Sequence, residues 1–105
     1  MVVSCQRDIP VFEPVEYNPT YTYLEIPNGF PIPNLPNDNP LTEEGIELGK
    51  KLFFDPILSG NNRLSCADCH FQSSAFSDPA RFSIGIEGVA GEFNASAIIN
   101  PAWNT

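Results

Sequence analysis

Residues 66–70 read Cys66-Ala67-Asp68-Cys69-His70, and this short run decides most of the fold. Two thiols three positions apart, followed directly by an imidazole, form the C-x-x-C-H signature of covalent haem attachment. On one helical turn both sulfurs reach the vinyl groups of one porphyrin, and the next side chain lies under the iron. Cys66, Cys69 and His70 are therefore predicted to bind a covalent haem c, with His70 as the proximal ligand of the iron.

Two other uses of paired cysteines fit these residues less well. A structural zinc site takes four ligands. The motif supplies three, and the adjacent Cys69 and His70 do not readily face one ion. A thioredoxin-like dithiol begins a helix after a strand of a βαβ unit, whereas a predicted helix and a Gly-Asn turn precede Cys66. Covalent haem is the interpretation that uses all three side chains.

The predicted haem iron has one obvious axial ligand. His70 is the only histidine and Met1 the only methionine of the sequence, so the residues that commonly close the sixth position in electron-transfer cytochromes do not follow the motif. Lys50 or Lys51 could ligate only after losing a proton, which is costly near neutral pH. An open distal side is the arrangement of peroxidases and globins. The residues thus favour a haem that meets a small oxidant over a simple electron carrier.

The composition fits one small, loop-rich domain. The 105 residues include 11 prolines and carry a formal net charge of −8. Because no basic patch can follow a phosphate backbone, nucleic acid is not expected as a partner. The roughly 65 residues from position 41 onward would form a marginal core alone, and a covalent haem would supply much of the missing apolar interior.

Residues 1–5 resemble the end of a bacterial lipoprotein signal. In the run Val2-Val3-Ser4-Cys5 the cysteine stands where such proteins are lipidated, so these residues are interpreted as a lipobox remnant and Cys5 as the lipidation site. An incidental cysteine is the alternative. Together with covalent haem, this predicts a periplasmic protein anchored to the membrane as a lipoprotein.

Residues 6–40 are rich in proline and tyrosine. Proline at this density prevents a continuous helix and keeps backbone N–H groups out of a sheet. The segment is predicted to be an extended arm, partly polyproline II, that lies against the body through its aromatic side chains. A flexible spacer is the alternative.

The clearest regular element follows the arm. Thr42 is a hydroxyl N-cap, and Glu43 and Glu44 stand in the first turn, where carboxylates suit the positive end of the helix dipole. Asp55-Pro56 ends the pattern. These signals predict a helix of about residues 43–53.

Weaker signals predict the remaining elements. A short helix is expected over residues 65–70 with Ser65 as its N-cap, and residues 95–99 could start another. Glycines at positions 85, 88 and 91 indicate a loop close to a bulky group. Trp103 is expected to pack in the core.

Four ordered blocks of the sequence resemble a known family. They are residues 48–56 (Leu-Gly-Lys-Lys-Leu-Phe-Phe-Asp-Pro), 58–60 (Leu-Ser-Gly), 65–70 (Ser-Cys-Ala-Asp-Cys-His) and 76–78 (Phe-Ser-Asp). In this order they resemble the opening of the bacterial dihaem cytochrome c peroxidases, the group that includes the MauG-type enzymes. The resemblance implies a mostly α, loop-rich chain. Residues 41–105 would form the N-terminal, peroxidatic part of a cytochrome-c-like helical haem domain, incomplete at its C-terminus, behind the long proline-rich arm.

The resemblance also implies an activity. In the family a second haem receives electrons from a small donor protein, a c-type cytochrome or a cupredoxin, and passes them to the peroxidatic haem, where hydrogen peroxide is reduced to water. Asn94 matches an asparagine that helps to bind calcium between the two domains, and the full-length protein is expected to form a homodimer. The second haem motif and the distal acid or base would follow Thr105, so the chain is interpreted as an N-terminal fragment. The alternatives are a small monohaem protein for electron transfer or ligand binding, and an inactive fragment.

Two positions depart from the family pattern. Ser83-Ile84-Gly85 is followed by Ile86, where members that inactivate their resting haem carry a histidine. The resemblance therefore implies a haem that needs no reductive release of a distal histidine. Phe93 stands where an arginine commonly precedes the asparagine, so contacts of that arginine, for example with a haem propionate, are not expected.

Overall fold

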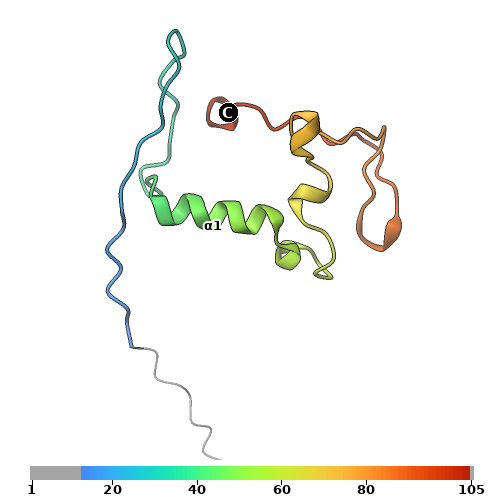
Figure 1. Ribbon diagram of the computed structural model, residues 1–105, viewed down its shortest axis with the longest axis horizontal. Coiled ribbons are helices and arrows are strands. Elements are labelled where there is room, and N and C mark those ends of the chain that lie inside the picture. Colours follow the sequence, from blue (N-terminus) through green and yellow to red (C-terminus); the bar gives the residue numbers. More distant parts are fainter. Residues whose placement is uncertain (1–12, 105) are drawn as a thin grey trace, which may run out of the picture.

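The computed structural model of the protein describes residues 13–104. Its main regular element is helix α1 (Glu43–Phe54), and single 3₁₀ turns follow along the chain (Figure 1): η1 (Pro56–Leu58), η2 (Cys66–Asp68), η3 (Gln72–Ser74), η4 (Ile86–Gly88) and η5 (Pro101–Trp103). Within this range, β-pairing is limited to isolated bridges. The mostly α, loop-rich prediction agrees with this architecture.

Local signals at both ends fix helix α1. The Thr42 hydroxyl accepts a hydrogen bond from the Gly45 N–H at 3.0 Å, which satisfies one of the free donors of the first turn. At the other end Asp55 leaves the helical conformation ahead of Pro56, and its carboxylate accepts from the Ile57 N–H at 2.9 Å to start η1. The predicted helix over residues 43–53 is confirmed to within one residue.

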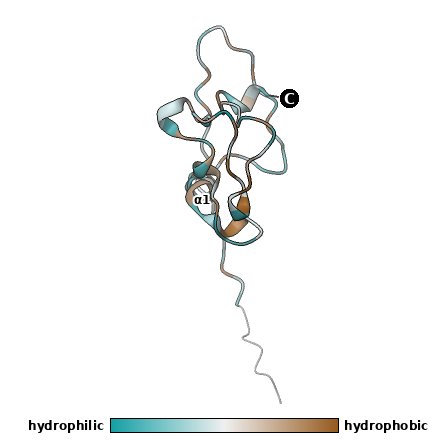
Figure 2. Cartoon of the chain, turned by 90° about the vertical axis from the view of Figure 1, so that its right-hand side faces the viewer, coloured by the Kyte–Doolittle hydropathy of each residue, from teal (hydrophilic) through white to brown (hydrophobic). Residues whose placement is uncertain are grey.

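The described chain does not close around an apolar core. No hydrophobic side chain within residues 13–104 is buried, and Ile46, Leu48 and Phe54 of α1 are at least half exposed. The radius of gyration is 20.2 Å, against about 13 Å for a compact domain of 100 residues. Figure 2 shows hydrophobic segments running along the loops beside α1. The helix therefore needs another apolar partner, a bound group or further polypeptide, to cover its exposed side.

Residues 20–22 pair with the start of α1. Tyr21 and Thr42 form an antiparallel bridge, and the Glu43 N–H donates to the Thr20 carbonyl at 2.9 Å. The Thr20 N–H in turn reaches both oxygens of the Glu44 carboxylate at 3.1 and 3.2 Å. Hydrogen bonds from its own backbone N–H and from Thr20 lower the pKa of Glu44. The first turn of the helix is thus tied to the segment before it.

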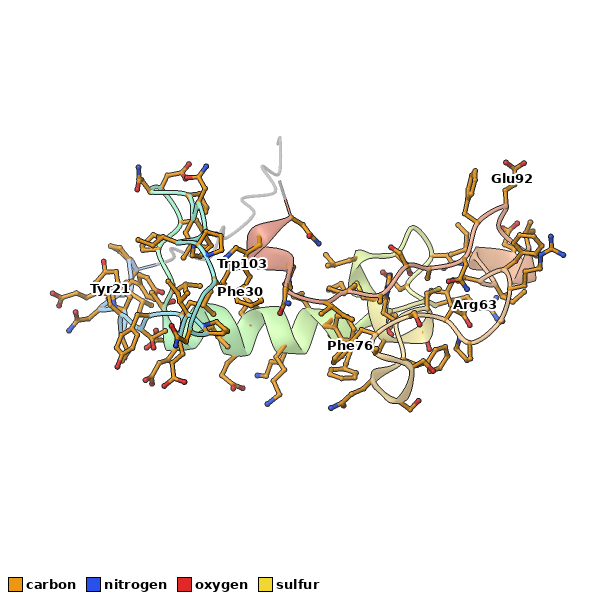
Figure 3. All side chains as sticks on the ribbon, turned by 90° about the horizontal axis from the view of Figure 1, so that it is seen from above. Tyr21, Phe30, Arg63, Phe76, Glu92 and Trp103 are labelled. Carbon is orange, nitrogen blue, oxygen red and sulfur yellow. The ribbon has the colours of Figure 1, made fainter. Side chains whose placement is uncertain are left out.

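A second contact joins segments far apart in sequence. The Trp103 indole Nε1–H donates to the Pro31 carbonyl at 2.8 Å, and its ring meets Phe30 edge-on with centroids 5.1 Å apart. Figure 3 shows the labelled Phe30 and Trp103 side by side. The prediction that Trp103 packs in a core is wrong, because the described residues form no core and the indole packs on the proline-rich segment. The segment boundaries at residues 5, 40 and 41 stay predictions.

The predicted helix over residues 95–99 is also wrong. The Ile98 N–H, which a helix would direct to the Asn94 carbonyl, donates to Phe76 O at 3.3 Å. The Ala95 carbonyl accepts from the Asp78 N–H at 3.3 Å. Because these backbone groups bond to residues 76–78, the segment stays extended. Pro101 occupies the first turn of η5.

The glycine-rich stretch forms a tight loop, as its composition indicated. The Gly85 N–H donates to Val89 O at 2.7 Å and the Gly91 N–H to Ser83 O at 2.9 Å. Gly88 has φ +76°, which glycine adopts without steric cost.

Among residues 13–104, no helix has the length and apolar character needed to cross a bilayer.

Candidate functional site

The C-x-x-C-H motif lies on one tight turn. η2 spans Cys66–Asp68, and the His70 N–H extends the turn by donating to the Cys66 carbonyl at 3.0 Å. The short helix predicted over residues 65–70 is thus a single 3₁₀ turn with one helical bond beyond it. Both cysteines are free thiols. They are carried by the same turn, as attachment to one group requires.

The carboxylate inside the motif closes this turn. The Ser65 N–H donates to Asp68 Oδ2 at 2.7 Å, and the Ser65 hydroxyl donates to the same oxygen at 2.8 Å. These two hydrogen bonds lower the pKa of Asp68. Ser65 is the N-cap residue, as predicted. Ser65 and Asp68 form a capping box, in which the Ser65 hydroxyl also donates to the Asp68 carboxylate.

His70 is oriented by a backbone carbonyl. Its Nδ1 lies 2.7 Å from the Phe76 oxygen. A carbonyl can only accept, so this distance assigns the proton to Nδ1 and leaves the lone pair on Nε2. Metal-binding histidines are held in this way by a partner behind the ring. The imidazole therefore presents one nitrogen as a ligand and has the other one occupied.

The three predicted haem-binding residues share a cavity of about 290 Å³. We call it the motif cavity; Cys66, Cys69 and His70 line it together with Leu58 and Leu64, among others. Its lining is mostly apolar, which fits the body of a porphyrin better than a hydrated ion. No group of three or more His, Cys, Asp or Glu side chains in residues 13–104 is placed to hold a metal ion. The donor set thus fits a covalently attached haem with one axial ligand.

An aromatic cluster lies next to this site. Phe53 at the end of α1 meets Phe76 edge-on at 6.0 Å and Phe54 at 5.1 Å. With Ile98 and Pro101, these rings line an apolar groove of about 360 Å³. Phe76 therefore contributes twice, since its carbonyl holds His70 and its ring packs on α1. The orienting carbonyl was missed in the sequence, because no residue-type signal marks a backbone acceptor.

The backbone that supplies this carbonyl has an unusual conformation. Ala75 and Phe76 have φ angles of 54° and 57°, both in the left-handed region that residues with a Cβ rarely enter. Each such residue costs about 1–2 kcal/mol. Such strain often accompanies a functional constraint.

The other predicted site residues do not line the motif cavity. Asn94 Nδ2 donates to Asp78 O at 2.9 Å and also to Ala80 O, so this amide fastens a loop; a calcium-binding role for it stays a prediction. Ile86 begins η4 and lines a neighbouring hollow with Arg63 and with Leu64, which also lines the motif cavity. Phe93 is 82% exposed. Cys5 lies outside the described residues.

Known proteins are similar in sequence to this chain. The family model of di-haem cytochrome c peroxidase matches residues 43–105. The methylamine utilization protein MauG of Methylorubrum extorquens is 43% identical over 70 residues, which are 67% of this chain and 20% of that protein. The cytochrome c peroxidase Ccp of Escherichia coli is 34% identical over 74 residues, which are 70% of this chain and 16% of that protein.

A solved structure is also similar to this chain. The crystal structure of a MauG-like protein associated with microbial copper homeostasis matches with a TM-score of 0.72 and 43% sequence identity. The match covers 78% of this chain and 23% of that one. The chain thus spans about a fifth of the length of such relatives. The matched segment contains the whole C-x-x-C-H turn, and the chain belongs to the di-haem cytochrome c peroxidase family.

Proposed function

We propose that this chain is the peroxidatic haem portion of a di-haem peroxidase that reduces hydrogen peroxide to water. The electrons would come from a small donor protein, a c-type cytochrome or a cupredoxin, through the second haem of the full-length protein. One observation carries the proposal: two free thiols and an imidazole with a fixed Nδ1 proton line one mostly apolar cavity.

Different residues of this chain would bind different parts of the haem. Cys66 and Cys69 would hold haem c by thioether bonds, and His70 would bind the iron through Nε2. Leu58 and Leu64 add apolar surface beside these three residues. When bound, the haem supplies an iron that accepts electrons and reacts with the O–O bond of peroxide.

The sequence supports an open distal position. His70 is the only histidine, and Met1 the only methionine, of the 105 residues. Where relatives carry a histidine, Ile86 offers an apolar side chain that cannot ligate. Among these 105 residues none of the usual sixth ligands follows the motif, so no ligand from this segment would have to be released before peroxide reacts.

Several further features belong to this proposal. Asn94 would help to bind calcium in the full-length protein, and that protein would form a homodimer. Cys5 would carry a lipid anchor on a periplasmic protein, and the family's covalent haem supports this location. None of these features is needed for haem attachment at residues 66–70, so they can be tested separately.

An optical and mass-spectrometric experiment tests the central proposal. The chain, expressed with a periplasmic haem-attachment system, should gain the mass of one haem and show high-spin ferric bands that shift on addition of peroxide. A low-spin spectrum without a peroxide response would favour the monohaem alternative instead. Absence of a Soret band would refute haem binding altogether.

A matched pair of variants controls for attachment. Replacing both motif cysteines, Cys66→Ser with Cys69→Ser, should abolish the covalent haem mass completely. Ser73→Cys adds an exposed thiol outside the motif, and this variant should still carry a single haem. Retention of covalent haem by the double serine variant would contradict the assignment of the thioether bonds.

A further inference from the structure

We infer that the left-handed pair Ala75–Phe76 is a positioning element that sets the ligand strength of His70 by holding the Phe76 carbonyl on its Nδ1. This inference rests on the proposed function, since it takes His70 as the axial ligand. It assigns a role to residues that carry no reactive group. Its basis is the backbone geometry between His70 and the carbonyl that follows six residues later.

The first basis is a loop that closes on itself. The Phe76 N–H donates to Phe71 O at 2.8 Å, and the Phe71 N–H donates to Ser77 O at 3.2 Å. The Ser77 hydroxyl and N–H both donate to Ser74 O, at 2.6 and 3.1 Å. These hydrogen bonds lie within residues 71–77, which we call the carbonyl loop. The carbonyl is thus held in place by the loop that follows the histidine.

The second basis is the type of residue in the left-handed positions. Asn62, Asn100 and Glu87 also have positive φ, but asparagine tolerates this conformation and Glu87 is a single residue. Ala75 and Phe76 do not belong to the tolerant types, and they are consecutive. Such a pair persists only where its surroundings over-determine it. Here the surroundings are the bonds of the carbonyl loop and the contact of the Phe76 ring with Phe53 of α1.

The third basis is the number of donors on one oxygen. Phe76 O accepts from His70 Nδ1 at 2.7 Å and from the Ile98 N–H at 3.3 Å. The shorter distance belongs to the imidazole, so the histidine is the favoured donor. A rotation of the Phe76 peptide would therefore change the hydrogen bond to His70. The direction of this peptide is set by the φ and ψ angles of Ala75 and Phe76.

The consequence for the histidine follows from second-shell chemistry. Donation from Nδ1 to a carbonyl makes the opposite nitrogen, Nε2, a more basic ligand. A more basic axial ligand stabilises the ferric state and lowers the reduction potential. Weakening the contact of Nδ1 with Phe76 O should therefore raise the potential and weaken the bond between iron and histidine.

The first test changes the strain without changing any ligand. Ala75→Val places a β-branched side chain at φ 54°, which should displace the Phe76 peptide. In the haem-loaded chain we expect a higher reduction potential and an iron–histidine stretching band at lower frequency. Asn62→Val is the matched control, because Asn62 also has φ 54° and lies outside the carbonyl loop. It should leave both values unchanged even if it costs stability.

A milder variant decides the matter where Ala75→Val acquires no haem. Ser77→Ala removes the hydrogen bond from the Ser77 hydroxyl to Ser74 O. It adds no side-chain bulk, so it does not force any φ or ψ angle of the loop to change. It should shift both values in the same direction by a smaller amount. Ser73→Ala, an exposed serine of the same loop, should shift neither.

The outcomes separate the two hypotheses. If the haem-loaded Ser77→Ala variant keeps the parental potential and stretching frequency, the positioning role is overturned while the proposed function stands. An equal shift in both members of a matched pair would also overturn it, because a general loss of stability would then explain the change. A parent chain without covalent haem would overturn both.

Discussion

Two regions of the molecule are held together in different ways. In the arm contact, residues 20–31 meet α1 and Trp103, and the bond from Trp103 Nε1 to Pro31 O joins positions 72 apart. Within the attachment region, residues 65–77, the hydrogen bonds that hold the motif turn and His70 join residues at most six positions apart, and the Ile98 N–H adds one longer-range bond to Phe76 O. Closing a short loop costs less chain entropy than closing a long one. The haem-binding geometry can therefore form locally, without an apolar core.

The largest expected effect is loss of the axial ligand. His70→Gly should lower the rate of the peroxide-induced spectral change by more than roughly 100-fold, because even partners behind a metal ligand are worth 10–100-fold. Stopped-flow absorption with the haem-loaded chain measures this rate. The covalent haem should remain, since Cys66 and Cys69 are intact.

Added imidazole is the control for the His70→Gly variant. It should occupy the space left by the side chain and restore part of the rate. A variant that reacts as fast as the parent would show that peroxide chemistry at this haem does not depend on His70.

The next effect should be confined to the arm contact. Trp103→Leu removes the bond to Pro31 O and the edge-on contact with Phe30, which together are worth about 2 kcal/mol. Urea unfolding of the haem-loaded chain should show this loss, and proteases should cut the proline-rich segment sooner. Trp103→Phe keeps an aromatic contact and should lose about half as much. A change in the haem spectrum of either variant would contradict the separation of the two regions.

Sequence reasoning succeeded where the structure is local. The ends of α1 follow from Thr42 and from Asp55 ahead of Pro56, which act within a few residues. The thiols and the imidazole of the attachment region are adjacent in sequence, so their meeting in one cavity needs no long-range information.

The predictions that went wrong depend on distant partners. Residues 95–99 carry helix-compatible side chains, but residues 76–78 compete for their backbone groups. Trp103 is apolar enough for a core, yet its partner is a carbonyl 72 positions away. The left-handed Phe76 has no signature at all, because an aromatic residue gives no hint of positive φ.

A smaller effect is expected at the start of α1. Thr42→Ala removes the acceptor of the Gly45 N–H, and loss of such an N-cap costs about 1 kcal/mol. Thr42→Ser keeps the hydroxyl and should stay close to the parent. Urea unfolding of the haem-loaded chain compares the two. Because Thr42 also pairs with Tyr21, protease cleavage of residues 20–31 should increase only in the alanine variant.

The smallest expected effect is a loss of stability at acid pH, which arises from a different carboxyl group in each of the two regions. Each region holds one carboxyl whose pKa is lowered by hydrogen bonds, Glu44 in the arm contact and Asp68 in the attachment region. Because the pKa of each group is lower in the folded protein, its hydrogen bonds contribute fully to the free energy of unfolding above the ordinary pKa values of 4.5 for Glu44 and 3.8 for Asp68. This contribution is lost as the pH falls through the pKa of the folded state. Both groups are exposed, so each loss should be small.

Amide variants assign the acid response to its region. Glu44→Gln should remove only the pH dependence of protease cleavage in residues 20–31. Asp68→Asn should remove only the pH dependence of amide exchange at Ser65, whose N–H donates to the carboxylate. Hydrogen exchange between pH 5 and pH 3 follows both groups in one sample. If Glu44→Gln changed the exchange of Ser65, the two regions would be coupled through α1, and the haem site would depend on the arm after all.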